Sequence, residues 1–417
     1  MTSRADDPDT LSEQTMIVRL PIFTRSKDVW GYEFLLSDPG AASGEEAPTL
    51  SGLVRFYQDH VARMPSPLAE KKLLLTLPDS VDLTADFRDE DGPMCAFFLN
   101  VDRAAHPDSV ALAEKLHQKG GALVVEESLE PCVRERLDHG CIIRVSLADK
   151  TPPEIVNIRK KFKGTNSEFL AVDVDSWEAF EGTRALGFSY FQGPFFSVPQ
   201  VREGVNLPAS AVAKLQLLRE LGNPDCEMDD LASIIATDVS LSYRILRYMN
   251  SAALGMRNKV RSIGQAVSLL GLNEVRHWAL VVVMTDIDST PRGEELSYLA
   301  LQRGRFLSQL AESMESVAHP PETMFLLGLF SKLDALLDCP MDRALEDIPL
   351  DDGIKEALCG TLNDFRDWLL LLDAVEIGNW EVANDILGRY GACLTSAATH
   401  YMRAASWAAR LLPELSH

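Results

Sequence analysis

Two hydrophobic patterns divide this chain. Up to about residue 186, short segments that are apolar along their whole length alternate with segments of helical periodicity. Such segments predict buried strands joined by helices, and therefore a parallel sheet. The predicted strands are 72–77, 96–101, 122–126, 141–146 and 169–174, and the predicted helices are 53–64, 110–118, 153–162 and 177–186. We expect this sheet to close into a (β/α) barrel with the helices outside.

The barrel is expected to open with a hairpin and to end with a short strand. Residues 16–21 and 29–36 predict two strands around a turn at Ser26, Lys27 and Asp28. The segment GFSYFQGPFFSVP at 187–199 predicts a strand followed by a Gly-Pro turn.

The rest of the chain has the apolar spacing of helices. Ser262 is a predicted N-cap, and Gly271 is expected to end the same helix in a left-handed turn. The predicted helices are 211–221, two within 230–249, 263–270, 296–316, 322–337, 354–375, 381–390 and 394–412. The small residues of 394–412 favour close packing on the bundle, with self-association into a homo-oligomer as the alternative.

A chain of 417 residues exceeds the usual size of one domain. The composition predicts a disordered tail at 1–15, a barrel domain at 16–199, a linker at 200–208 and a helical domain at 209–417. The polar start and the lack of a long apolar run predict a cytoplasmic protein that does not bind the membrane. Seven cysteines without a CxxC pair favour neither a disulfide framework nor a zinc site, and we expect no cofactor.

The net charge of −22 excludes nucleic acid as a general partner, but one stretch departs from it. No acidic residue lies between Asp238 and Glu274, and the basic residues there are Arg244, Arg247, Arg257, Lys259 and Arg261. This basic stretch is either a solvated face that pairs with acids of its own fold, or a surface that binds an acidic partner protein.

Three motifs in order carry a family resemblance: RLPIFTRSKDVWGYEFLL, then GFSYFQGPFFSVP, then a helical stretch with Asp238, Leu241, Asn250-Ser251 and Gly271. The chain resembles bacterial signalling proteins that join an EAL-type domain to an HDOD domain. The resemblance implies a barrel related to phosphodiesterases that hydrolyse cyclic di-GMP with two divalent metal ions. It also implies a helical domain that has the HD hydrolase fold without its metal ligands.

The resemblance also implies where a metal site would lie, and the sequence departs from it. Glu33 matches the glutamate of the family signature, but Ser37 replaces an arginine that grips substrate phosphate. Thr76 replaces a ligand asparagine, and Asn100 and Asp102 stand where a Thr-Glu pair is expected.

The later strands depart further from the family pattern. Glu126-Glu127 replaces Asp-Asp, Arg144 and Ser146 replace the Lys and Asp of a Lys-x-Asp element, and Val172 replaces a metal-binding glutamate. Asp175 and Gln192-Gly193 are retained. Because a two-metal site needs its carboxylates together, we expect no hydrolysis. In the helical half, Ser331-Lys332 stands where HD enzymes have His-Asp, and neither His277 nor His319 has carboxylates spaced to form a metal site.

We therefore predict a non-catalytic adaptor whose helical domain binds a regulatory protein, with the basic stretch as the partner surface. One alternative is a sensor that binds cyclic di-GMP without turnover, with Glu33, Glu126, Glu127 and Gln192 as candidate ligand-binding residues. A metal-dependent phosphodiesterase is the other.

Overall fold

The computed structural model describes residues 16–37, 71–76, 95–99, 114–115, 117–118, 120–128, 141–201, 209–221, 223, 227–250 and 260–415. The chain divides into two compact units. We call Met1–Val198 with Asp373–Met402 the barrel unit, and Pro199–Leu372 with Arg403–His417 the helical unit. The predicted tail, the helix at 53–64 and most of the predicted linker lie outside the described residues, and the predicted domain limits stay predictions.

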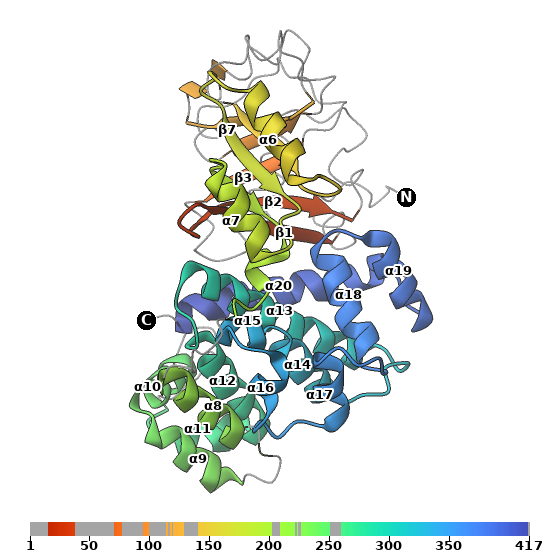
Figure 1. The fold of residues 1–417 in the computed structure, drawn as a ribbon. Helices are drawn as coiled ribbons and strands as arrows, with labels where there is room; N and C mark the ends of the chain where they lie inside the picture. Colours follow the sequence, from red (N-terminus) through yellow and green to blue (C-terminus); the bar gives the residue numbers. More distant parts are fainter. Residues whose placement is uncertain are drawn as a thin grey trace, which may run out of the picture. The chain divides into compact units, whose positions relative to one another are not determined.

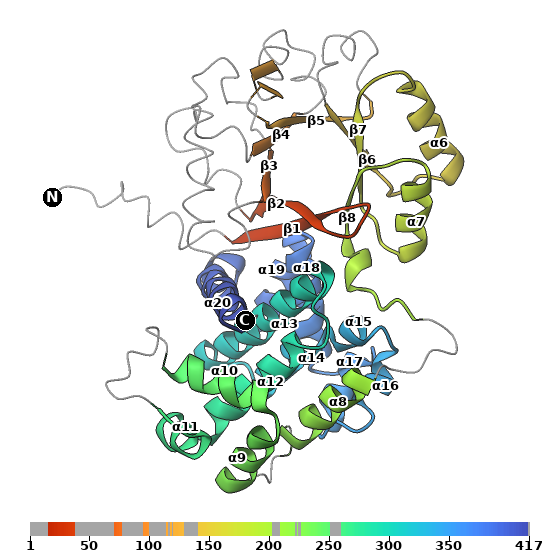
Figure 2. The same ribbon diagram turned by 90° about the vertical axis from the view of Figure 1, so that its left-hand side faces the viewer.

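The strands of the barrel unit close into a barrel in sequence order, as the sequence predicts (Figures 1 and 2). They are β1 (Ile17–Thr24), β2 (Val29–Leu36), β3 (Lys72–Thr76), β4 (Cys95–Leu99), β5 (Ala122–Glu126), β6 (Ile142–Ser146), β7 (Glu168–Val172) and β8 (Tyr190–Gln192). β1 runs antiparallel to both of its neighbours, β2 and β8, and every other neighbouring pair is parallel.

The opening hairpin forms as predicted because its turn and its free ends are both fixed by hydrogen bonds. Lys27 takes a φ of +69° in the turn, and the backbone N–H of Thr24 donates to Asp28 O at 2.8 Å. At the other end, the backbone N–H of Met16 donates to Ser37 Oγ at 2.9 Å, and Ser37 N donates back to Met16 O at 3.0 Å.

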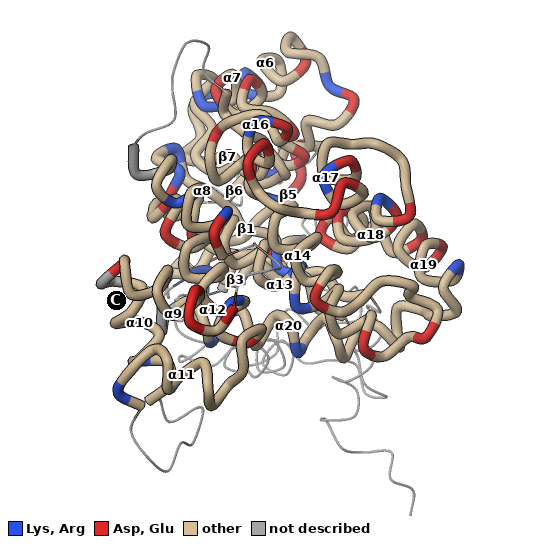
Figure 3. The backbone as a smooth tube through the Cα atoms, turned by 90° about the horizontal axis from the view of Figure 1, so that it is seen from below, with Lys and Arg blue, Asp and Glu red and all other residues tan. Residues whose placement is uncertain are grey.

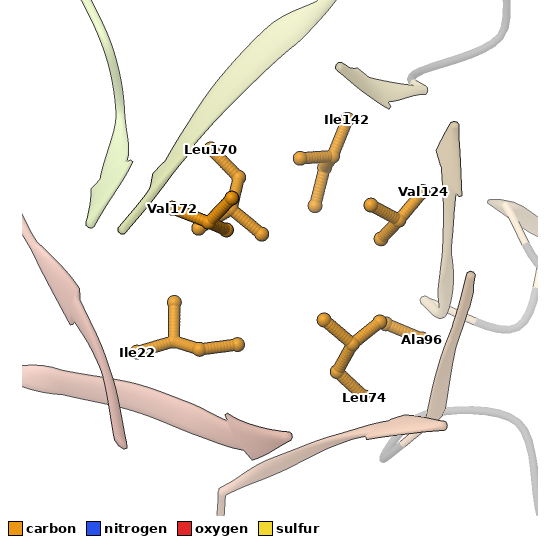
Figure 4. Close-up of a cluster of buried hydrophobic side chains, with 7 residues drawn as sticks. All are labelled: Ile22, Leu74, Ala96, Val124, Ile142, Leu170 and Val172. Atoms are coloured by element: carbon orange, nitrogen blue, oxygen red, sulfur yellow. The ribbon is translucent and has the colours of Figure 1, made fainter. Parts of the chain in front are cut away.

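The barrel is filled by aliphatic side chains, one or two from most of its strands, which point toward one another in Figure 4. The members are Ile22, Leu74, Ala96, Val124, Ile142, Leu170 and Val172. Since side chains alternate between the two faces of a strand, a residue two positions beyond a member also faces the interior. The barrel is therefore a packed core whose polar inward positions come at the carboxyl ends of its strands.

Helices α6 (Pro152–Lys161) and α7 (Trp177–Ala185) lie side by side outside the barrel (Figure 2). Ile155 and Ile158 of α6, and Trp177 and Phe180 of α7, are buried. After β8 the chain turns at Gly193, whose φ is +146°. A side chain there would collide with the backbone of Val174, which explains a glycine at this position.

From residue 209 onward the described chain is helical. Its helices are α8 (Ala209–Leu221), α9 (Met228–Thr237), α10 (Val239–Met249), α11 (Ile263–Leu270), α12 (Leu272–Thr285), α13 (Pro291–Ser313), α14 (Pro321–Phe330), α15 (Leu333–Leu337), α16 (Met341–Leu345), α17 (Asp352–Leu358), α18 (Arg366–Glu376), α19 (Trp380–Arg389) and α20 (Leu394–Leu415). Within the described residues, none of these helices combines the length and the apolar character needed to cross a bilayer.

The predicted ends of α11 are correct in position and wrong in one detail. The side chain of Ser262 caps the helix by accepting from Gln265 N at 3.2 Å. Gly271 has a positive φ of +89°, but its ψ of 160° lies outside the left-handed helical region. The extended ψ lets α12 begin at the next residue, so Gly271 ends one helix and precedes another.

Two predicted helices are each two helices in the structure. The segment 322–337 breaks between α14 and α15 at Ser331 and Lys332, and the segment 354–375 breaks between α17 and α18. Gly360, with a φ of +97°, directs the second break. Periodic spacing on both sides of a short turn hides such breaks from the sequence.

Candidate functional site

The polar end of the barrel interior contains a buried carboxylate, that of Glu33, whose side chain is 2% exposed. Arg144 Nη1 donates to Glu33 Oε1 at 2.7 Å, and Gln192 Nε2 donates to Glu33 Oε2 at 2.8 Å. Both carboxylate oxygens are thus hydrogen-bonded, one of them by a cation. Two of the four candidate ligand-binding residues, Glu33 and Gln192, are brought together.

The strand register explains why these side chains meet. Glu33 pairs with Leu74, an interior residue, and Arg144 lies two positions beyond the interior residue Ile142. Arg144 therefore extends from β6 toward Glu33 on β2, on the inside of the sheet.

Arg144 has a second contact that fixes its guanidinium. Its Cζ lies 4.9 Å from the centre of the Phe98 ring of β4, within the range of a cation–π interaction. A planar guanidinium suits this combination of a ring face and a carboxylate better than an ammonium would. Arg144 stands out in the sequence as a substituted position, but no sequence pattern indicates that it binds Glu33.

The other two candidate residues make different contacts. Glu126 ends β5 and accepts a hydrogen bond from Ser128 Oγ at 3.3 Å. Glu127 forms an ion pair with Lys150 at 2.7 Å, and its side chain is 20% exposed. The four candidates are thus divided into the bonded pair of Glu33 and Gln192 and two acids with other partners.

The substituted positions have structural roles of their own. Val172 is 4% exposed and belongs to the aliphatic cluster of the barrel. Ser37 closes the hairpin, and Ser146 Oγ donates to Asp173 Oδ2 at 2.5 Å. Thr76 is exposed at the end of β3. Asn100 and Asp102 lie outside the described residues.

The barrel residues that the structure describes do not fit a divalent metal centre. The charge of Glu33 is compensated by the ion pair with Arg144, and the inward position on β7 holds the aliphatic side chain of Val172. Within the part of the chain that the structure describes, no three His, Cys, Asp or Glu side chains gather to hold a metal. The side chains present thus differ in chemistry from the carboxylates that the two-metal site of the resembled family needs.

In the helical unit, the segment that corresponds to the HD ligands packs into the interior. Ser331 Oγ donates to Gly328 O at 2.6 Å, and Arg303 Nη1 donates to Ser331 Oγ at 3.2 Å. Lys332 is 9% exposed and Arg303 is 3% exposed. Burial raises the pKa of the neighbouring Asp334 carboxyl. The segment thus contains one buried basic side chain, Lys332, and packs against another, Arg303.

The two histidines considered as ligands pack against aromatic rings. The His277 ring lies 4.9 Å from that of Phe325, and the His319 ring stacks on Phe365 at 4.0 Å. Burial lowers the pKa of His277, which favours its neutral form. Both line a cavity of about 400 Å³ in the helical unit.

The basic stretch is not one continuous surface in the described structure. Arg244 pairs with Asp286 at 2.5 Å, and Lys214 binds the other oxygen of Asp286 at 2.9 Å. For Arg244, the interpretation as a pair within its own fold therefore holds. Arg247 is half-buried and Arg261 is exposed. Arg257 and Lys259 lie outside the described residues.

Motif residues of the helical unit support its backbone. Asp238 caps α10 by accepting from Leu241 N at 3.0 Å. Asn250 Oδ1 accepts from Val260 N at 2.8 Å, and its Nδ2 donates to Val260 O at 2.9 Å. Asn250 thus joins the two ends of the segment between α10 and α11.

Comparison with known proteins gives matches to both halves. A family model described as the HDOD domain matches residues 207–342. The uncharacterized protein YuxH of Bacillus subtilis (strain 168) is 24% identical over 389 residues, which cover 89% of this chain and 93% of YuxH. The cyclic di-GMP phosphodiesterase CdgJ of Vibrio cholerae serotype O1 is 29% identical over 388 residues, covering 88% of this chain and 86% of CdgJ.

Among solved structures, an EAL domain protein from Listeria monocytogenes EGD-e is similar at 11% identity and a TM-score of 0.34, covering 47% of this chain and 92% of that one. The FimX EAL domain from Pseudomonas aeruginosa bound to c-di-GMP is similar at 12% identity and a TM-score of 0.33, covering 46% and 95%. The HDOD match and the closed barrel define the class, a barrel followed by an HDOD domain. Residues 207–342 of the chain thus match the HDOD domain, and the strands β1 to β8 before them form the closed barrel.

Proposed function

We propose that this chain is a non-catalytic signalling adaptor whose barrel does not hydrolyse cyclic di-GMP. The observation that carries the proposal is the bonding of Glu33, whose two carboxylate oxygens are taken by Arg144 and Gln192. In this arrangement the carboxylate of the family signature serves the packing of the barrel.

The electrostatic argument concerns the charge that a metal ion would meet. A divalent cation needs carboxylates with uncompensated negative charge, and hydrolysis needs that cation to deprotonate water. The Glu33 charge is compensated by a guanidinium 2.7 Å away, and the same guanidinium repels a second cation. Arg144 is also a poor proton acceptor, because arginine stays protonated at any workable pH.

A second candidate function is favoured by one comparison. The relative named as a cyclic di-GMP phosphodiesterase is similar over most of both chains, so hydrolysis is the rival proposal. A third is binding of cyclic di-GMP without turnover, with Glu126 and Glu127 as the acids that remain near the carboxyl ends of the strands.

One experiment separates these functions. The full chain is titrated with cyclic di-GMP by calorimetry in the presence of Mg²⁺ or Mn²⁺, and the same samples are analysed for linear product. An active phosphodiesterase serves as positive control, and Glu33→Gln as the matched variant. We expect no product from either form of this chain. Product from the wild-type chain that is lost in Glu33→Gln refutes the proposal, and saturable binding without product supports the sensor.

The adaptor role itself rests on the helical unit. Of the other members of the basic stretch that the structure describes, Arg261 is exposed and Arg247 is half-buried. They stay our candidates for contact with an acidic regulatory partner, while Arg244 serves the fold. Acidic positions recur along α16, α17, α18 and α19 (Figure 3). The basic stretch thus contrasts with these helices in charge.

A further inference from the structure

A groove of about 980 Å³ lies on the outside of the barrel unit, along α6 and α7. Its walls are mostly apolar, and they include Ile155 and Val156 of α6, Ala179 of α7, and Leu186. Ile377, which belongs to the same unit, adds a side chain that is 59% exposed. We call this feature the acidic groove, for the charges on its rim. The two helices that form it lie side by side in Figure 2.

The rim of the acidic groove carries four exposed carboxylates, which are Asp149, Asp173, Asp175 and Glu178. Lys150 is the one basic side chain among the described residues that line the groove, and it is paired with Glu127 at 2.7 Å. The groove therefore combines an apolar floor with a strongly negative edge.

The fold explains how these charges are held together. Asp149 and Asp173 follow β6 and β7 in turns where their φ angles are +58° and +59°, a conformation that Asp tolerates. The amino ends of α6 and α7 are at the same end of the barrel, and their positive ends stabilise nearby carboxylates. The turns and the helix ends thus favour acidic side chains at this end of the barrel.

We propose that the acidic groove binds an amphipathic helix of a partner protein, with the apolar face of that helix on the floor and lysine or arginine side chains along its flank. A groove between two helices that is apolar below and charged at its rim suits this mode of recognition. Charge complementarity selects a basic helix and rejects acidic ones. This adds a second partner surface to the proposed adaptor, and it does not depend on whether the barrel hydrolyses a nucleotide.

A second copy of this chain is the competing occupant. Its net charge of −22 opposes self-association. The last turn of α6 is basic, however, with Arg159, Lys160 and Lys161. Two copies would therefore pair through antiparallel α6 helices, and the test must detect such a dimer.

The probe is an 18-residue amphipathic leucine-lysine peptide with a fluorescent label, titrated with the full chain and followed by anisotropy. A leucine-glutamate peptide of the same periodicity is the control probe. We expect saturable binding of the lysine peptide, no binding of the glutamate peptide, and at least tenfold weaker binding when salt rises from 50 to 300 mM.

The blocking variant is Gly182→Leu, which fills the groove from the middle of α7, where an added Cβ meets no atom within 4 Å. Gly388→Leu on α19 is the matched control, since a Cβ there is equally unhindered. We expect at least tenfold weaker peptide binding for Gly182→Leu and a change under twofold for Gly388→Leu. Circular dichroism of both variants verifies that they are folded.

The charge variants separate the groove from the general negative charge of the chain. Asp149→Asn, Asp175→Asn and Glu178→Gln together remove three rim charges, and Asp229→Asn, Glu346→Gln and Asp347→Asn remove three exposed charges elsewhere. We expect at least tenfold weaker binding for the first set and little change for the second. Equal effects of the two sets overturn the proposal. So does sedimentation showing a dimer of the wild-type chain that Gly182→Leu dissociates, because the occupant is then a second copy.

Discussion

The side chain of Glu33 is 2% exposed, and two donors stabilise its carboxylate in the barrel interior. A buried charge without a partner costs several kcal/mol, whereas a charge that is paired and hydrogen-bonded is tolerated. Arg144 supplies the opposite charge and Gln192 supplies a donor to the second oxygen. These two residues therefore stabilise a signature carboxylate in the interior of the barrel.

We expect Arg144→Met to destabilise the chain by about 2–3 kcal/mol, because Glu33 then loses its cation inside the barrel. The double variant Arg144→Met/Glu33→Gln removes both charges and is expected to recover most of this loss. Urea unfolding at pH 7 measures each free energy. Lys150→Met is the control, because it breaks the more exposed pair with Glu127 and should cost less than about 1 kcal/mol. Equal effects of Arg144→Met and Lys150→Met contradict the argument.

At the residue scale, the sequence predicts which side chains are present and misses which of them meet. Glu33 and Gln192 are retained motif residues, so a candidate list can include them from the sequence alone. The bond between Glu33 and Arg144 joins β2 to β6 across 111 positions of the chain. No local pattern encodes such a pairing, because it follows from the register of a closed barrel.

At the element scale, α13 and α14 pack at unusually short distance through Gly304 and Gly328. A Cβ on Gly328 would collide with the backbone of Gly304, and a Cβ on Gly304 would come within 2.8 Å of Phe325 O. Paired glycines allow two helix backbones to approach until their peptide groups touch. The buried faces of both helices depend on this approach.

We expect Gly328→Ala to destabilise the chain by about 1–3 kcal/mol, since the added methyl group forces the two helices apart. The control is Gly264→Ala on α11, where a Cβ meets nothing within 4 Å. That change should stabilise the chain by up to about 1 kcal/mol, because alanine restricts the unfolded chain more than glycine does. Thermal unfolding of both variants gives the two signs, and a stabilised Gly328→Ala contradicts close packing.

Elements are the scale at which the sequence predicts best. The strands of the barrel follow from apolar runs, and α11 follows from Ser262 and its spaced apolar residues. The break at Ser331 and Lys332 is missed because apolar spacing continues on both sides of it. The turn is held by the bond from Ser331 to Gly328 O and by Arg303 on α13, a contact between distant segments.

At the scale of the whole molecule, the barrel unit is made from two separate parts of the chain. Asp373–Met402 groups with Met1–Val198, although the rest of the helical sequence forms the other unit. Gly378 lies so close to β2 that a Cβ would contact Leu35 Cδ1. Ile377 lines the acidic groove. Composition places one boundary near residue 200, and it gives no sign that the chain returns to the barrel.

Because Asp373–Met402 belongs to the barrel unit, we expect a chain that ends at residue 372 to have a weakened barrel. Removing these residues exposes apolar surface around Leu35, so local opening of β2 needs less free energy. Hydrogen exchange of β1 and β2 measures this, and we expect at least tenfold faster exchange than in the full chain. A chain that ends at residue 402 is the control, because it keeps the barrel unit whole and shortens only the helical unit. Equal protection of β2 in both truncations contradicts the grouping.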